Sequence, residues 1–214
     1  MPTQAIIFDL DGTLLDTLQD LTDATNHVLK SLGQPPITPS ACRQMIGNGV
    51  RVLLQRAAVG NEQTIQNALD QFLAYYHDHK FDHTTAFPDI PSTLDALTTK
   101  GKRLAVLSNK PHPATIEMVH RLLGDWKFEQ VFGQRENVPL KPDPSAAIDI
   151  AKHMNIPPSN IVFVGDSGED MATAKAANMF AVGVTWGLRE EHELREHGAD
   201  AIIHNPTQLL DVIP

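Results

Sequence analysis

The sequence predicts an α/β protein whose parallel sheet is interrupted by a helical insert. Short apolar segments alternate with amphipathic helical patterns from residue 103 onward, and one further apolar segment lies at residues 6–8. Between them, residues 16–81 show helical patterns only. Because strands that alternate with helices form right-handed βαβ units, we expect the strands to lie in one parallel sheet.

The first strand is predicted at Ile6, Ile7 and Phe8, where no polar residue interrupts the apolar run, as is typical of a strand buried on both faces. Asp9 and Asp11 follow at its carboxyl end, where open α/β sheets bind ligands. Taken alone, this pair fits a divalent-cation site, a nucleophile with its acid/base partner, or an ordinary Asp-Gly turn.

The insert is expected to be a separate helical domain. Its apolar residues recur at helical spacing in four stretches, which lie at residues 18–32, 39–46, 50–60 and 65–76. The segment 81–88 is polar and ends in proline, as a linker would. The predicted division is residues 1–15 with 87–214 for the α/β core and residues 16–86 for the insert.

The core is expected to continue with further buried strands. They are predicted at Leu104–Leu107, Ile161–Val164, Ala181–Val184 and Ala201–Ile203, with a weaker pattern at Val131-Phe132. Helical patterns separate these segments, so each crossover is expected to return the chain to the same sheet.

Polar side chains follow three of these strands, and a lysine opens one helix. The groups are Asp9 with Asp11, Ser108 with Asn109, Asp166 with Asp170, and Lys141. Since strand ends of a parallel sheet meet at one edge, we expect a common site. Its carboxylates would repel one another without a hard cation, and Mg²⁺ prefers such oxygen ligands. Ser108, Lys141 and backbone N–H groups would bind the remaining oxygens of a phosphate, so the pattern indicates phosphoryl transfer.

Four of these segments resemble, in the same order, the motifs of the haloacid dehalogenase-like superfamily. They are Asp9-Leu10-Asp11-Gly12-Thr13, Ser108, Lys141, and Gly165-Asp166 through Asp170. The resemblance implies a Rossmann-like core with a small α-helical cap formed by the insert. It also implies a Mg²⁺-dependent phosphomonoester hydrolase that acts through an aspartyl-phosphate.

The resemblance assigns a role to each motif residue. Asp9 would be the nucleophile, and Asp11 would protonate the leaving oxygen and then deprotonate the hydrolytic water. Mg²⁺ would be held by Asp9, the backbone carbonyl of Asp11 and Asp166, with Asp170 as a ligand or the partner of a ligand. Ser108 would hydrogen-bond the phosphoryl group, and Lys141 would offset negative charge. Leu10 and Thr13 are expected at the phosphate, Thr13 also orienting Asp11 or its turn.

The same residues separate branches of the superfamily. Dehalogenases carry no acid/base aspartate at the position of Asp11, so its presence favours phosphate chemistry. Hydrolases of phosphonoacetaldehyde use a cap lysine as a Schiff base, and no lysine lies between Lys30 and Lys80. A mutase or phosphatase for a sugar phosphate, nucleotide or pyrophosphate stays open, as does a non-catalytic regulatory protein on this scaffold.

Two segments are similar to phosphoglycolate phosphatases, which makes phosphoglycolate the favoured substrate. In the insert, residues 43–50 resemble the segment that those enzymes place over the active site, so Arg43 and Asn48 are candidates for binding a substrate carboxylate. The alternative is a glycine turn with a solvated Arg43. Residues 108–111 are also similar, which makes Asn109 and Lys110 candidate substrate contacts, although Lys110 could equally be a solvated lysine.

Composition limits the partners. The net charge of −9 argues against binding to nucleic acid or an anionic membrane. Cys42 has no cysteine to pair with, and no signal peptide or membrane-spanning run is predicted, so a cytoplasmic location is expected. The expected partner is a small phosphorylated metabolite, and the protein is expected as a monomer or small homo-oligomer.

Overall fold

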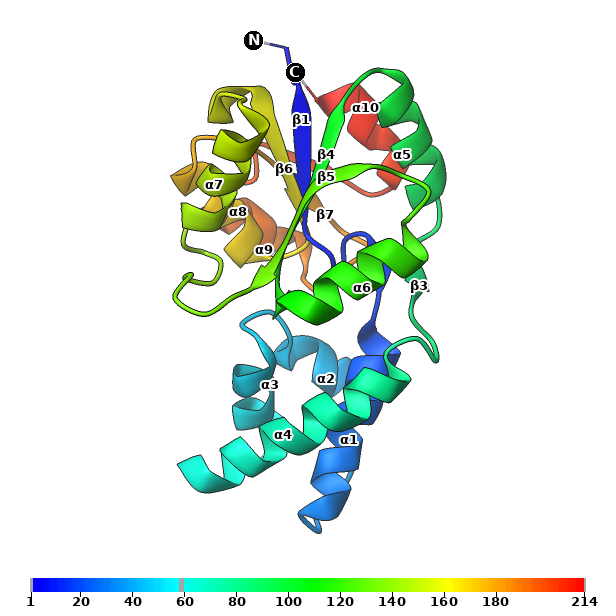
Figure 1. The fold of residues 1–214 in the computed structure, drawn as a ribbon, viewed down its shortest axis with the longest axis vertical. Helices are drawn as coiled ribbons and strands as arrows, with labels where there is room; N and C mark the ends of the chain where they lie inside the picture. The colour runs from blue at the N-terminus through cyan, green and yellow to red at the C-terminus, as the bar shows by residue number, and fades with distance from the viewer. Residues whose placement is uncertain (1, 58–59, 214) are drawn as a thin grey trace. The chain divides into compact units, whose positions relative to one another are not determined.

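A parallel sheet of six strands organises the computed structural model, which describes residues 2–57 and 60–213 (Figure 1). Its order is β5-β4-β1-β6-β7-β8. The strands are β1 Ala5–Phe8, β4 Arg103–Pro111, β5 Phe128–Gln134, β6 Ile161–Gly165, β7 Phe180–Val184 and β8 Ala201–Ile203. Every neighbouring pair is parallel. The predicted α/β fold class with a Rossmann-like sheet is therefore confirmed.

Strand β1 lies at the centre of the sheet because it pairs on both sides. Ile7 is in register with Ala105 of β4 and with Phe163 of β6. All four of its residues are buried, which explains why the segment reads as an unbroken apolar run. The residue that follows, Asp9, is thereby fixed at the middle of the sheet's carboxyl edge.

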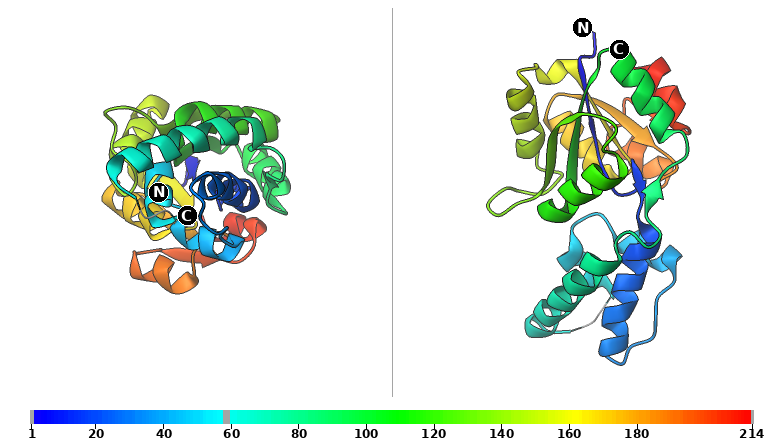
Figure 2. Two further views of the ribbon diagram at one scale, coloured as in Figure 1. Left: turned by 90° about the horizontal axis from the view of Figure 1, so that it is seen from below. Right: turned by 45° about the vertical axis from the view of Figure 1, so that its right-hand side comes forward.

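Helices cover both faces of this sheet (Figures 1 and 2). They are α5 Ile90–Thr99, α6 His112–Leu122, α7 Ser145–Met154, α8 Gly168–Ala176, α9 Glu191–Glu196 and α10 Leu209–Val212, with 3₁₀ turns at Pro158–Asn160 and Pro206–Gln208. A buried apolar cluster joins Leu107 and Phe163 of the sheet to Ile150 of α7 and Met171 of α8. Helices α7 and α8 are thus tied to one face of the sheet by apolar burial.

The chain divides into two compact units, residues 1–15 with 86–214 and residues 16–85. The second, the helical unit, contains α1 Leu18–Ser31, α2 Pro39–Met45, α3 Val50–Ala57 and α4 Glu62–His79. Short strands β2 Leu15–Asp16 and β3 Thr85–Ala86 pair with each other. The helix expected at residues 50–60 is described to Ala57, and residues 58–59 lie outside the described residues.

Local signals in the sequence explain where two helices of this unit begin. The side chain of Thr38 accepts a hydrogen bond from the Ala41 N–H at 3.2 Å, and Pro39 takes the first helical position. Asn61 does the same for the Thr64 N–H at 2.9 Å. Among the described residues, no helix is long and apolar enough to cross a membrane.

A buried carboxylate closes the helical unit on itself. Asp20 of α1 accepts hydrogen bonds from the Thr84 hydroxyl at 2.6 Å, the Thr84 N–H at 2.9 Å and the His83 N–H at 3.0 Å. These contacts join the start of the unit to its end, more than sixty residues later. Asp20 is 2% exposed, so its charge depends on these donors.

We therefore expect Asp20→Ala to destabilise the protein by about 2–4 kcal/mol, because two buried donors and one partly buried donor lose their charged acceptor. Urea unfolding followed by circular dichroism measures the change. The matched variant is Asp23→Ala, since Asp23 makes an exposed hydrogen bond with Gln19 and lies 3.9 Å from His83. Its expected effect is about 0–1 kcal/mol. Equal losses in the two variants would contradict this role for Asp20.

Candidate active site

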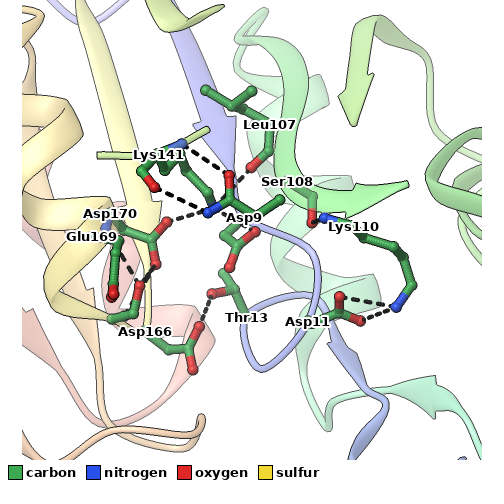
Figure 3. Close-up of polar contacts among 12 residues, drawn as sticks. Asp9, Asp11, Thr13, Leu107, Ser108, Lys110, Lys141, Asp166, Glu169 and Asp170 are labelled. Carbon is green, nitrogen blue, oxygen red and sulfur yellow. Dashed lines mark hydrogen bonds and ion pairs between the residues drawn. The ribbon is translucent and has the colours of Figure 1, made fainter. Parts of the chain in front are cut away.

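The polar strand ends meet around Asp9, at the carboxyl end of β1 (Figure 3). The Asp9 N–H donates to the carbonyl of Val164 at 2.9 Å, which continues the pairing with β6 beyond the last residue of β1. Asp9 is 8% exposed, and its Oδ1 lies 2.7 Å from the ammonium of Lys141. The carboxylate is thus held on a fixed backbone and faces a buried cation.

Lys141 joins three elements through its single ammonium group. The Nζ lies 2.7 Å from Asp9 Oδ1 and 2.7 Å from Asp170 Oδ1, and it donates to the Leu107 carbonyl at 3.1 Å. These three acceptors match the three donors of an ammonium. Burial lowers the pKa of Lys141, but the charges of Asp170 and Asp9 outweigh it and raise that pKa above its usual value. Lys141 therefore stays charged.

The backbone of Lys141 is fixed by Asn109, which follows Ser108 in β4. The Lys141 N–H donates to Asn109 Oδ1 at 2.9 Å, and Asn109 Nδ2 donates to the Lys141 carbonyl at 3.1 Å. The Lys141-Pro142 peptide bond is cis. Asn109 thus acts on Lys141, a role that sequence reasoning missed, and its predicted contact with substrate stays a prediction.

Asp170 and Asp166 are held at the start of α8 by different donors. Asp170 Oδ2 accepts from the Ser167 hydroxyl at 2.6 Å and from the Ser167 N–H at 3.1 Å, as part of a capping box. Asp166 accepts from the Thr13 hydroxyl at 3.1 Å and from the Leu188 N–H at 2.6 Å. The Ser-x-x-Asp spacing in the sequence could have predicted the capping box. No sequence pattern indicates the contact between Leu188 and Asp166.

Gly12 is required by this close packing. It has a φ of 85°, and a Cβ at this position would lie 2.3 Å from Asp166 Oδ2. Only glycine therefore lets the loop after β1 approach Asp166. The same loop presents the Thr13 hydroxyl to Asp166 rather than to Asp11. The predicted phosphate contacts of Thr13 and of the buried Leu10 stay predictions.

Asp9, Asp166 and Asp170 form a cluster that could hold a divalent metal ion. All three are buried, and one carboxylate oxygen from each lies within 4.8 Å of the others. Burial raises the pKa of Asp9 well above its usual range, Lys141 opposes the shift, and Asp170 and Asp166 add to it. Burial and the charge of Asp170 raise the pKa of Asp166 to about 7. Three carboxylates facing one lysine leave an excess of negative charge, which a bound divalent cation would balance.

Asp11 lies apart from this cluster and binds Lys110 (Figure 3). Both carboxylate oxygens of Asp11 lie 3.0 Å from Lys110 Nζ. The side chains are 13% and 3% exposed, so this ion pair is largely buried. The hydroxyl of Ser108 accepts from the Lys110 N–H at 3.2 Å, which leaves the hydroxyl proton for another acceptor.

Arg43 and Asn48 belong to the helical unit, which is described on its own. Asn48 lies between Gly47 and Gly49, whose φ values are 127° and 83°. Its Oδ1 accepts from Arg56 at 2.9 Å, and Arg56 also donates to the Met45 carbonyl at 3.0 Å. Arg56 therefore fixes this glycine turn, which sequence reasoning missed. The predicted substrate contacts of Arg43 and Asn48 stay predictions.

Comparison with known proteins agrees with this fold and site. The profile of the haloacid dehalogenase-like hydrolase family matches residues 6–184. The chain is 33% identical to a phosphoglycolate phosphatase of Psychrobacter arcticus, over 99% of this chain and 93% of that protein. It is 34% identical to phosphoglycolate phosphatase 1 of Pseudomonas aeruginosa, over 96% and 78%. The structure of a predicted phosphoglycolate phosphatase from Haemophilus somnus superposes with a TM-score of 0.91 at 29% identity, covering 98% of this chain and 97% of that one.

The fold and site thus define a hydrolase, and the chain belongs to the haloacid dehalogenase-like hydrolase family. Its relatives place it more narrowly, among the phosphatases of that family. The resemblance inferred from the four motifs is confirmed.

The raised pKa of Asp166 predicts how the metal-free protein responds to pH. A carboxyl whose folded pKa exceeds its unfolded value binds its proton more tightly when folded, so its contribution to stability is full below pH ~4 and is lost as pH rises through about 7. We expect the free energy of unfolding in EDTA to fall by roughly 2–4 kcal/mol between pH 5 and pH 8.

Asp166→Asn should make this decline shallower, because an amide does not ionise, and saturating Mg²⁺ should do the same for the parent chain. Urea titrations at each pH give the measurement. A metal-free stability that is flat or rises over this range, or an unchanged slope in Asp166→Asn, would refute the prediction.

Proposed function

We propose that this protein is a Mg²⁺-dependent phosphomonoester hydrolase that forms an aspartyl-phosphate on Asp9, with phosphoglycolate as the favoured substrate. The observation that carries the proposal is the separation of the two motif carboxylates. Asp9 lies in the buried cluster with Lys141, Asp166 and Asp170, whereas Asp11 lies outside it. A nucleophile and a proton carrier need such different surroundings.

The proposed chemistry follows from these positions. A carboxylate oxygen of Asp9 attacks phosphorus and forms an O–P bond, while the bond to the ester oxygen breaks and Asp11 gives that oxygen its proton. Water then attacks phosphorus, Asp11 takes the proton of the water, and the Asp9–phosphorus bond breaks to release phosphate. The Ser108 hydroxyl donates to a phosphoryl oxygen, and Lys141 balances the charge of Asp9.

The three clustered carboxylates support Mg²⁺ as the metal, because Mg²⁺ prefers hard oxygen ligands and shares phosphate oxygens with them. When bound, Mg²⁺ would supply positive charge against the developing charge on the phosphoryl group. Asp9 and Asp166 are the proposed side-chain ligands, together with the Asp11 carbonyl. Asp170 contacts the Lys141 ammonium and the Ser167 hydroxyl. These contacts suit either a metal ligand or a residue that orients the metal ligands.

Substrate choice is proposed from the relatives and from the helical unit. Two relatives are phosphoglycolate phosphatases, and segment 43–50 resembles the substrate-facing segment of those enzymes. We propose that the helical unit is the cap and that Arg43 and Asn48 contribute to binding the substrate carboxylate. Another small phosphorylated metabolite, hydrolysed or transferred by a mutase, is the alternative.

A panel of phosphorylated metabolites tests this function. We expect phosphoglycolate to rank first by kcat/KM, with sugar phosphates, nucleotides and pyrophosphate at least about tenfold lower, equivalent to the loss of one charged contact. EDTA should abolish turnover and Mg²⁺ should restore it. Asp9→Asn is the inactive control. A low rank for phosphoglycolate would overturn the substrate, and activity retained in EDTA would overturn the metal.

A further inference from the structure

The ion pair between Lys110 and Asp11 stands in the way of the proposed proton transfer. Both oxygens of Asp11 face the Lys110 ammonium at 3.0 Å, in a place where the two side chains are 13% and 3% exposed. Among the described residues, Asp11 has no other side-chain partner. Its carboxylate is therefore oriented by Lys110 and not by any group of the Asp9 cluster.

A proton carrier must direct an oxygen at the ester oxygen that leaves, beside Asp9. Charge-assisted contacts at this distance are strong, and little water reaches the pair to weaken them. Freeing the Asp11 carboxylate without a replacement would take a counter-charge away from a largely buried ammonium, which is costly. Productive binding therefore calls for another anion to take over Lys110.

The two lysines of the site differ in this respect. The Lys141 ammonium is saturated by Asp9, Asp170 and the Leu107 carbonyl, and its backbone is tied to Asn109. The backbone of Lys110 is fixed by β4 and by Ser108. Its flexible side chain, however, contacts the Asp11 carboxylate, which the reaction needs beside the leaving oxygen.

We propose that the carboxylate of the substrate displaces Asp11 from Lys110, so that binding of the correct substrate frees the Asp11 carboxylate, which takes from solvent the proton that it then gives to the leaving oxygen. The proposal rests on the proposed function, since it takes Asp11 as the proton carrier and a carboxylated phosphate ester as substrate. One ion pair replaces another, so Lys110 stays compensated throughout. In phosphoglycolate a single carbon separates the carboxylate from the ester oxygen, so an anion on Lys110 lies next to the oxygen that Asp11 must protonate.

This arrangement makes Lys110 a positioning residue that favours carboxylated substrates through the chemical step. An alkyl phosphate without a carboxylate binds its phosphoryl group but leaves Asp11 held by Lys110, so proton transfer to its poor leaving group is slow. The preference for carboxylated substrates then appears in kcat as well as in KM, because the contact between Lys110 and the substrate carboxylate assists the transition state. A lysine that only anchors the carboxylate would act on carboxylated substrates alone.

The test compares phosphoglycolate with ethyl phosphate in the parent protein and in Lys110→Met, which keeps the length of the side chain without its charge. We expect kcat/KM for phosphoglycolate to fall by about 10- to 150-fold, the range for loss of a charged hydrogen bond. For ethyl phosphate we expect kcat to rise by a few-fold, about 3-fold or more, because Asp11 is no longer restrained. Effects of opposite sign support the exchange.

Two controls make the result specific. Lys152→Met removes an exposed lysine that lies 3.3 Å from Asp149 on α7, and it should leave the ratio of the two substrates unchanged. Lys110→Arg keeps a cation and should retain part of the preference for phosphoglycolate. Inhibition by 3-phosphonopropionate and by propylphosphonate gives a readout without turnover: only the carboxylated analogue should bind more weakly to Lys110→Met.

Lower activity of Lys110→Met on both substrates, or no rise with ethyl phosphate, would overturn the exchange and leave Lys110 as an anchor or a structural residue. Failure of the proposed function looks different. In that case the parent protein itself shows no Mg²⁺-dependent activity, or no preference for phosphoglycolate over ethyl phosphate, before any variant is compared.

Discussion

The site depends on the Lys141 ammonium, whose Nζ lies 2.7 Å from Oδ1 of Asp9 and 2.7 Å from Oδ1 of Asp170. The lysine comes from the segment before α7, and the two carboxylates follow β1 and β6, so a single group ties three parts of the chain together. Its side chain is 4% exposed. Loss of one partner from such a buried group costs about 3–5 kcal/mol, because charge is left without compensation.

Apolar packing makes this arrangement possible. Strand β1 is buried on both faces and paired on both sides, so Asp9 is delivered to a fixed point on the carboxyl edge of the sheet. The capping box at the start of α8 fixes Asp170, and Gly12 lets the preceding loop reach Asp166. The resulting cluster carries more negative than positive charge, and a bound divalent cation would balance that excess. Asp11 is kept out of it on a second lysine, Lys110.

The sequence was informative wherever one strong local pattern decided the structure. The apolar runs at Ile6–Phe8 and Ile161–Val164 predicted β1 and β6, because only a strand buried on both faces tolerates so little polarity. The meeting of Asp9, Lys141 and Asp170 followed from the rule that parallel strands share a carboxyl edge. Strand β4 runs to Pro111, beyond the predicted end at Leu107, since the polar residues after Leu107 are also extended and buried.

The remaining contacts could not be predicted, because they join side chains far apart in the chain through loops of unpredictable path. Asn109, a predicted substrate contact, is found to hold the Lys141 backbone, and the Thr13 hydroxyl donates to Asp166 rather than to Asp11. Lys110 was weighed between a substrate contact and a solvated lysine, and it is buried against Asp11. In each case the residue type allowed several partners, and the tertiary fold decided among them.

The central claim is that Asp9, and no other carboxylate of the cluster, attacks phosphorus. Asp11→Asn should allow this step with an aryl phosphate, whose leaving group needs no proton, and should then stall because no base activates water. Rapid quenching of this variant with a ³²P-labelled aryl phosphate and Mg²⁺ should yield about one equivalent of hydroxylamine-sensitive label in the peptide that contains Asp9. Label on another residue, or a burst of product with no labelled protein, would contradict the account.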